Sequence, residues 1–391
     1  MTPVNGEMPG GRRVRLGDVL SLEYGTSLPS RERDTYGKFP VAGSNGPDGK
    51  HSRALVCSPG VVVGRKGSAG SVYWYDEDYW PIDTTYYVVP KVPLEMRWVY
   101  YLLSYLPLRS LATTTGVPGL NRNDAYALEV YLPVVSEQRR IAEILDNADG
   151  LRRLRAEADT KAERIPPALF LKMFGDPVTN PMGWQVKLLG ELGELERGRS
   201  VHRPRNDAVL LSGPHPFIQT GDVANCEGRI RSFTQTYSEA GLAQSKMWPA
   251  GTLCITIAAN IASTGVLDFD ACFPDSVVGF SAGSCTTTEY VQFFLFHLRK
   301  MLEHSAPRLA QRNINLQVLR SLPVPTPPAE LQRQFSSYVR EYYDSRIRQT
   351  TARNVLDKLF ASTMGQAFSD DLNRHGRQHA DEFREEMERR S

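Results

Sequence analysis

The chain has 391 residues, of which 41% are hydrophobic, 23% charged and 9% aromatic. This composition argues against a disordered or fibrous protein and predicts two or three globular domains. The formal net charge is only +2, so a polyanionic partner would have to be bound by local patches of charge. Five cysteines without a C-x-x-C pair fit reduced thiols. With no long apolar run and no signal-peptide core, the chain is expected in the cytoplasm without membrane contact.

The first ordered segment is predicted to be a β-rich globule over residues 11–134. A polar leader, residues 1–10, precedes it and is expected to be disordered. Short β-branched and aromatic runs alternate with Gly, Pro and Asn turns, as in an irregular sheet. Residues 97–111 have helical spacing, 113–124 form a polar loop, and 126–133 return as an extended segment.

A long amphipathic helix is predicted next, over residues 135–178. Apolar residues recur at alternating steps of three and four, which is the spacing of a helix that packs against a partner helix. They are Ile141, Ile144, Ala148, Leu151, Ala158, Ala162, Ile165 and Leu169. Pro166 and Pro167 should kink or end the helix near its last turns.

Beyond this helix the same series of segments begins again. Gly190 and Gly198 are eight residues apart, as are Gly17 and Gly25. Farther along, the helical pattern at 290–295 repeats that at 98–103 with an offset of 192. An ordered series of such matching segments predicts an internal repeat, with a second globule over 179–325.

The second repeat is followed by a second long helix, predicted over residues 326–370, and by a charged tail over 371–391. The apolar face of this helix is expected to consist of Leu331, Phe335, Tyr338, Tyr342, Ala352, Leu356 and Leu359. The predicted fold class is therefore α+β, with two pseudo-repeated β-rich domains separated by two long coiled-coil-like helices. If these helices pack antiparallel, a quasi-two-fold axis relates the two halves.

The sequence contains none of the common catalytic motifs. It has no G-x-x-x-x-G-K-[ST] loop, no Cys/His cluster with zinc spacing and no G-x-S-x-G elbow, which favours a binding protein without cofactor or metal over an enzyme. Two alternatives stay open: a stand-alone DNA-modifying enzyme, and an adaptor that clamps a symmetric protein partner through its helices.

Polar loops in both globules are rich in the side chains that bind nucleic acids. Two similar globules could grip separated sites on duplex DNA, where Arg, Lys, Asn, Gln and hydroxyl side chains reach phosphates and base edges. In the first globule the candidates are Arg31, Arg33, Lys38, Ser44, Asn45, Lys50, Arg53, Arg65, Lys66, Ser68, Asn121, Arg122 and Asn123. In the second they are Arg197, Arg199, Arg203, Arg205, Gln219, Thr220, Asn260, Ser263, Thr264, Arg308, Gln311, Arg312 and Asn313. Each one alone is equally well explained as a polar surface residue; the set favours DNA.

Several stretches resemble the specificity subunits of type I restriction-modification systems. They are Leu16-Gly17-Asp18 with Tyr24-Gly25, the Arg65-Lys66-Gly67-Ser68 turn, the run over residues 132–146, Met173-Phe174-Gly175-Asp176-Pro177 and Leu359-Phe360-Ala361-Ser362. Residues 137–146, which enter the long helix, form the most specific of these. The resemblance covers about residues 15–368.

This resemblance implies a non-catalytic DNA-recognition subunit. Each target-recognition domain would read one half of a bipartite double-stranded DNA target. The helices would form an antiparallel pair that acts as a spacer and docks two DNA-methyltransferase (M) subunits, joined by restriction (R) subunits where the system cleaves DNA. The residues expected to dock partners are Ile141, Ile144, Leu145, Leu151, Phe335, Tyr338 and Tyr342.

Overall fold

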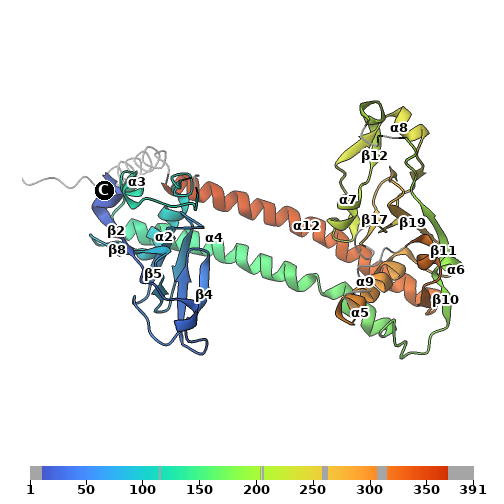
Figure 1. Ribbon diagram of the computed structural model, residues 1–391, viewed down its shortest axis with the longest axis horizontal. Helices are drawn as coiled ribbons and strands as arrows, with labels where there is room; N and C mark the ends of the chain where they lie inside the picture. The colour runs from blue at the N-terminus through green and yellow to red at the C-terminus, as the bar shows by residue number, and fades with distance from the viewer. Residues whose placement is uncertain are drawn as a thin grey trace, which may run out of the picture. The chain divides into compact units, whose positions relative to one another are not determined.

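The computed structural model describes residues 11–113, 116–202, 204, 207–257, 263–305 and 315–368. These residues form two compact units (Figure 1). Within the described part, residues 11–155 and 352–368 make up the first unit, and residues from 156 to 351 make up the second. The leader over 1–10 and the tail over 371–391 lie outside the described residues.

The first unit is built around a four-stranded antiparallel sheet. Its strands are β1 (Arg12–Arg15), β2 (Leu20–Tyr24), β3 (Phe39–Gly43), β4 (Gly46–His51), β5 (Gly60–Gly64), β6 (Val72–Tyr75), β7 (Trp80–Pro81), β8 (Thr85–Pro90) and β9 (Glu129–Leu132). The main sheet has the order β2-β8-β5-β6, a smaller one has the order β4-β3-β7, and β1 pairs with β9. Strand β5, a valine run between glycines, is buried along its whole length, as a central strand should be.

Short helices complete the first globule. They are α1 (Leu16–Val19), the 3-10 helix η1 (Ser30–Glu32), α2 (Met96–Tyr105) and α3 (Arg122–Tyr126). The helix predicted from residue 97 is α2, which ends earlier than expected, two residues before a proline. Its buried face, including Trp98 and Leu102, packs in one core with Leu16, Val61 and Val63.

The second unit repeats this arrangement. Its strands are β10 (Val186–Leu188), β11 (Gly193–Arg197), β12 (Leu211–Phe217), β13 (Arg229–Ile230), β14 (Gln235–Tyr237), β15 (Met247–Trp248), β16 (Leu253–Thr256), β17 (Thr264–Leu267), β18 (Ala271–Cys272), β19 (Val277–Ala282) and β20 (Pro323–Pro325). Its helices are α6 (Leu189–Leu192), η2 (Ala208–Leu210), α7 (Thr220–Ala224), α8 (Glu239–Ala243), α9 (Thr288–Ser305) and α11 (Leu316–Arg320).

Strand order confirms the predicted internal repeat. The order β2-β8-β5-β6 returns as β11-β19-β16-β17, with β13 added at the edge. The parallel pair β3 and β7 returns as β12 and β18, and the outer pair β1 and β9 returns as β10 and β20. The two globules therefore share the topology of their main sheets, and the second adds β13, β15, α7 and α8.

The long helices are interrupted where the prolines predict. They are α4 (Val135–Ala162), α5 (Ile165–Phe174) and α12 (Ala329–Phe368). A proline occupies the first turn of α5, where the missing backbone N–H costs no hydrogen bond. The first helix of the repeat therefore ends at Ala162 and restarts at Ile165, which confirms the predicted break.

Within each unit the ends of two long helices run antiparallel. In the first unit Leu145 shares a core with Met364, and farther along α4 Arg152 donates to Asp357 over 2.7 Å. The residue numbers of the contacts on α12 thus fall as the residue numbers along α4 rise, so the helices are antiparallel. In the second unit Asp159 and Glu163 contact Arg346, and Phe170 contacts Phe335. The helical segments therefore run antiparallel there as well (Figure 1).

A buried glutamine fixes the start of each long helix in the same way. Gln138 Oε1 accepts the backbone N–H of Glu95 at 2.9 Å, and Gln332 Oε1 accepts that of Thr287 at 3.2 Å. Each amide also donates to a proline carbonyl just before its helix, at 2.8 Å. Equivalent residues of the two repeats are therefore 192 positions apart in the globules and 194 positions apart in the long helices.

The predicted packing face of α4 is correct at Ile141 and wrong at Ile144 and Leu151 farther along the helix. Ile144 and Leu151 are 44% and 56% exposed, whereas Ile141 and Leu145 are buried. The cause is that polar Gln138 belongs to the buried face, where hydrogen bonds satisfy its amide. A count of apolar residues alone leaves such a position out.

The same correction applies to α12. Tyr338, Ala352 and Leu359 are exposed, while Val339 and Tyr343 are buried. Hydrogen-bonded polar side chains again occupy part of the buried face. The face that packs on the globule therefore differs from the apolar series read off the sequence.

Candidate nucleic-acid interface

Two arginines lie against the ring of an exposed tyrosine in the first unit. Tyr24 ends β2 and is 48% exposed. The guanidiniums of Arg65, which follows β5, and Arg122, which opens α3, each lie 4.8 Å from its ring centroid. Each guanidinium also donates a hydrogen bond to a backbone carbonyl, Arg65 to Asp83 at 2.8 Å and Arg122 to Leu22 at 3.2 Å. The ring contact and this bond together hold the guanidinium in a defined orientation.

Backbone hydrogen bonds join the two loops that carry these arginines. The carbonyl of Arg65 accepts the N–H of Leu120 at 2.9 Å, and the N–H of Gly67 donates to Pro118 at 3.0 Å. Gly67 has φ +76°, a left-handed conformation that favours glycine. The 64–70 turn and the loop before α3 thus form one surface.

The turn between β3 and β4 adjoins this surface. Ser68 Oγ lies 3.4 Å from Asn45 Oδ1, and a Cβ on Gly67 would lie 3.5 Å from Ser44 Oγ. Through these neighbouring turns, eight of the predicted contacts share one surface with this tyrosine. The Tyr24 surface, as we call it, consists of Tyr24, Ser44, Asn45, Arg65, Lys66, Ser68, Asn121, Arg122 and Asn123.

Other candidates of the first globule lie before, in or just after the β3–β4 hairpin. Arg33 is engaged by the fold, since its largely buried guanidinium pairs with Asp48 at 2.8 Å and donates to the carbonyl of Leu28. The remaining cations are exposed, and they are Arg31, Lys38, Lys50 and Arg53. Asn121, within the Tyr24 surface, also uses its side chain to cap α3.

The second unit has a different surface at the corresponding place. Arg197 ends β11 as Tyr24 ends β2, and Arg199 follows it; both arginines are exposed. Gln219 caps α7 and donates to Gln235 at 2.6 Å, and Thr220 is the first residue of that helix. The predicted contacts that fall outside the described residues are Arg203, Arg205, Asn260, Arg308, Gln311, Arg312 and Asn313.

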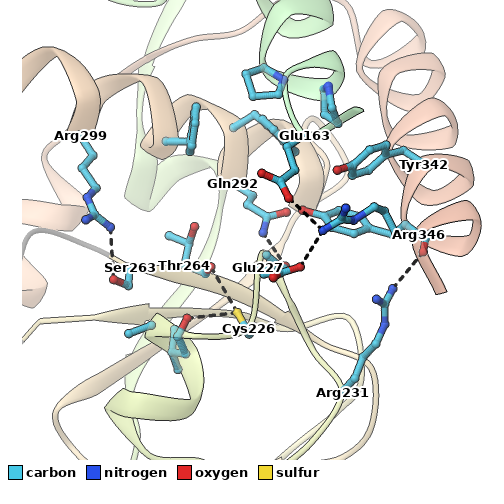
Figure 2. Close-up of a pocket in the computed structure, with 18 of the residues that line it drawn as sticks. Glu163, Cys226, Glu227, Arg231, Ser263, Thr264, Gln292, Arg299, Tyr342 and Arg346 are labelled. Carbon is cyan, nitrogen blue, oxygen red and sulfur yellow. Dashed lines mark hydrogen bonds and ion pairs between the residues drawn. The ribbon is translucent and has the colours of Figure 1, made fainter. Parts of the chain in front are cut away.

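Ser263 and Thr264 line a cavity in the second unit instead of an outward loop (Figure 2). The cavity has a volume of about 390 Å³. Ser263 Oγ accepts a hydrogen bond from Arg299 at 3.2 Å, and the Cys226 thiol donates to the Thr264 carbonyl. Burial raises the pKa of the Cys226 thiol, which keeps it protonated and unreactive near neutral pH.

One arginine closes the helical side of this cavity. Arg346 of α12 donates to Glu163, between α4 and α5, at 3.1 Å and to Glu227 at 3.0 Å, as Figure 2 shows. It also lies 4.0 Å from Asp159. With three acidic neighbours the guanidinium has a structural role, because it ties the globule to both long helices within the unit.

Metal and membrane features are not found in the described part of the chain. Over those residues no group of three or more His, Cys, Asp or Glu side chains is placed to hold a metal ion. Likewise, none of the helices that the structure describes is both long and apolar enough to cross a membrane.

The fold defines this molecule as a tandem repeat of one α+β unit. The chain belongs to the family of type I restriction modification DNA specificity domains, whose model matches residues 12–164 and 181–356. Both repeats are covered, so the resemblance read from the sequence is confirmed.

Individual relatives are distant. The chain is 24% identical over 147 residues to the type I restriction enzyme EcoprrI specificity subunit of Escherichia coli, covering 36% of each protein. It is 24% identical over 151 residues to the MjaIX specificity subunit of Methanocaldococcus jannaschii, covering 34% of each. The aligned stretch thus spans about a third of the length of the curated relatives it matches.

Solved structures show the same fold over nearly the whole chain. The crystal structure of the type I restriction-modification S subunit from M. genitalium superposes with a TM-score of 0.62 at 16% identity, covering 94% of this chain and 98% of that one. A chain from a structural study of type I R-M assembly and conformational transition gives a TM-score of 0.56 at 18% identity, over 92% and 98%. The fold class predicted from sequence is therefore confirmed.

Proposed function

We propose that this chain is the DNA-specificity subunit of a type I restriction-modification assembly. The globules over 11–134 and 179–325 each read one half of a bipartite duplex target, and the helices over 135–178 and 326–370 hold two methylation subunits. Methylation, and cleavage where it occurs, are carried out by partner subunits. Family membership supports this role, and the Tyr24 surface is the observation that carries it.

The Tyr24 surface has the chemistry that duplex DNA requires. Each of its arginines spends one N–H on a backbone carbonyl, and its other N–H groups suit guanine or phosphate; the exposed amides can both donate to and accept from base edges. Arg65 and Arg122 need little further ordering on binding, because stacking on the ring already restricts their rotamers. The corresponding strand end in the second globule is Arg197, which supports different half-sites for the two globules.

The experiment that tests this function maps methylated adenines in the genome of cells with and without the chain. With the chain and its methylation subunits present, adenine methylation is expected at a two-part sequence motif with a fixed gap. An unchanged methylation map would contradict the proposal. Methyl transfer by the purified chain alone would favour a stand-alone enzyme, and failure to bind any duplex in the assembled state would favour a protein adaptor.

The exposed apolar residues of α4 are proposed as part of the docking surface. Ile144, Leu151 and Leu154 are 44%, 56% and 64% exposed and lie within about 80° of one another around the helix. Burying each against a partner would contribute about 1.5–3 kcal/mol. Replacing Ile144 and Leu151 with glutamate is therefore expected to weaken assembly with methylation subunits at least about tenfold.

Co-purification and sedimentation of the assembly check this prediction. The matched control is Arg153→Glu, which introduces the same side chain on the opposite side of α4. Since Ile144 and Leu151 are exposed, circular dichroism of the variant should match that of the unmodified chain. Normal assembly of the variant would exclude this side of α4 from docking.

A further inference from the structure

Each globule is joined to the long helix that follows it by an ion pair. In the first unit Arg97 of α2 donates Nε to Asp146 Oδ1 of α4 at 2.5 Å. In the second unit Arg340 of α12 donates Nε to Glu289 Oε1 of α9 at 3.0 Å. The two globule positions are 192 residues apart and the two helix positions 194. These are the same offsets that relate the two buried glutamine contacts, so the ion pairs occupy equivalent places.

The charges of these equivalent pairs are reversed. In the first unit the globule supplies the cation, and in the second it supplies the acid. The ion pairs that join the helical segments keep their polarity instead. Arg152 of α4 pairs with Asp357, and Arg346 of α12 pairs with Glu163 just after α4, so the arginine lies on the helix that begins in that unit. At the globule–helix contact, both halves have an ion pair at the same place, but the residue at each position differs in charge.

In the first unit the pair is held rigidly. The guanidinium of Arg97, whose side chain is 17% exposed, lies 4.8 Å from the Trp74 ring of β6 and 4.9 Å from that of Tyr100. Tyr101 donates its hydroxyl to Asp146 Oδ1 at 2.6 Å. Sheet, α2 and α4 therefore meet at one charged hydrogen-bond network.

In the second unit the pair is reinforced by another arginine. Glu289, with 5% of its side chain exposed, also accepts from Arg229 at 2.9 Å. Burial alone would raise the pKa of Glu289, but the bond to Arg340 and the charges of both arginines outweigh it, so the pKa is lowered. The carboxylate is thus charged at neutral pH, and the pair is a true ion pair.

The ion pairs lie where they can restrict rotation of a globule on its helix. Each is eight residues beyond the buried glutamine, a separation of about 12 Å along the helix axis. A single polar contact leaves the globule able to rotate about that point on the helix. Two polar contacts, the glutamine and the ion pair, about two helical turns apart restrict this rotation. The apolar contacts between the two anchors are non-directional and define an angle poorly; in the second unit a further hydrogen bond, from Ser336 to Thr287 at 2.9 Å, lies between them.

We propose that Arg97–Asp146 and Glu289–Arg340 are positioning contacts that fix the angle of each recognition globule on its helix. This angle governs how strictly the gap between half-sites is read, a consequence that rests on the proposed function. The reversed polarity shows that each half meets the same geometric requirement with its own charges.

The experiment uses the full chain with Arg97→Asp, Asp146→Arg and the double reversal R97D/D146R. Spin labels on Cys57 and on Glu143→Cys, with Cys226 and Cys285 replaced by serine, report the globule–helix distance in the first unit without DNA. Each single reversal is expected to broaden the distance distribution, because it opposes like charges, and the double reversal to narrow it again. Asp146→Asn, which keeps the side-chain shape, covers the case in which a single reversal unfolds the globule.

The matched control reverses Glu137 and Arg140, an ion pair internal to α4, and should leave the distribution unchanged. Unchanged distributions in the folded single reversals would overturn the proposal whatever the DNA results. The outcome of the distance measurement therefore does not depend on the proposed function.

The second arm compares the affinity of the assembled protein for duplexes with the cognate gap and with a gap one base pair longer. The ratio of the two affinities is expected to fall about tenfold in each single reversal and to recover in the double. A role in stability alone would weaken both duplexes equally and keep the ratio, which would overturn the functional part. If the charge reversals broaden the distance distribution but the unmodified protein binds both duplexes equally well, the proposed function fails and the positioning role holds.

Discussion

Phe170→Ala is expected to destabilise the second unit by about 3–5 kcal/mol, the usual cost of deleting a buried aromatic ring. The Phe170 side chain is fully buried. Its ring centroid lies 5.0 Å from Phe174, 5.4 Å from Tyr290 and 5.6 Å from Phe335, so three helices contribute to one aromatic cluster. Rings held by three helices cannot easily collapse into the space, and the cavity therefore remains.

Amide hydrogen exchange measures this effect unit by unit, since exchange reports local and sub-global opening. Amides of β16 and β19 should exchange faster in the variant, whereas those of β5 and β8 in the first unit should not change. Leu171→Ala is the matched control, because Leu171 is the neighbouring residue of α5 and is 42% exposed. It should cost less than about 1 kcal/mol. Equal protection of β16 in both variants would contradict the central place of Phe170.

The helices and the repeat could be predicted because their signals are local. The prolines at the start of α5 mark a break through the chemistry of their own backbone, and recurring glycines mark equivalent turns. Strand pairing depends instead on contacts between distant residues: Leu20 of β2 lies opposite Pro90 of β8. Nothing near either residue specifies that partner, so the sheet order became known only from the structure.

The packing face of the helices was missed for a different reason. Gln138 and Gln332 are buried and hydrogen-bonded, yet a search for apolar spacing treats glutamine as a surface residue. The antiparallel direction of α4 and α12 within each unit is correctly predicted, but that prediction came from the family resemblance; the repeat alone left the direction open.

The candidate DNA-binding residues were predicted by type but not by location. Arg65 and Arg122 come together through a backbone bond at Leu120, which no local pattern reveals. Tyr24 was missed as a surface residue, since aromatic residues of a β-rich globule usually belong to its core. Its place at a strand end, between turns rich in cations, is the signal that could have identified it.

Replacing Arg65 and Lys66 together with alanine is expected to weaken duplex binding by the assembled protein about ten- to a hundredfold near 0.1 M salt. Lys66 is exposed, and Arg65 lies stacked on Tyr24 in the same turn. Each cation that neutralises a phosphate releases counterions. The slope of log affinity against log salt should therefore fall by about 0.9 for each phosphate that the variant no longer neutralises.

Binding titrations over a series of salt concentrations measure affinity and slope together. The matched control is Arg164→Ala with Lys172→Ala, which removes the same two charges from exposed positions of the second unit. A third variant, Arg122→Lys, keeps the charge but removes the planar guanidinium that stacks on Tyr24.

Arg122→Lys separates two modes of contact. If Arg122 binds phosphate, all duplexes should weaken alike, whereas relaxed preference at a single base pair would identify direct reading of a base edge. Unchanged affinity and unchanged salt slope in the Arg65 and Lys66 double variant would remove the 64–70 turn from the DNA contact surface.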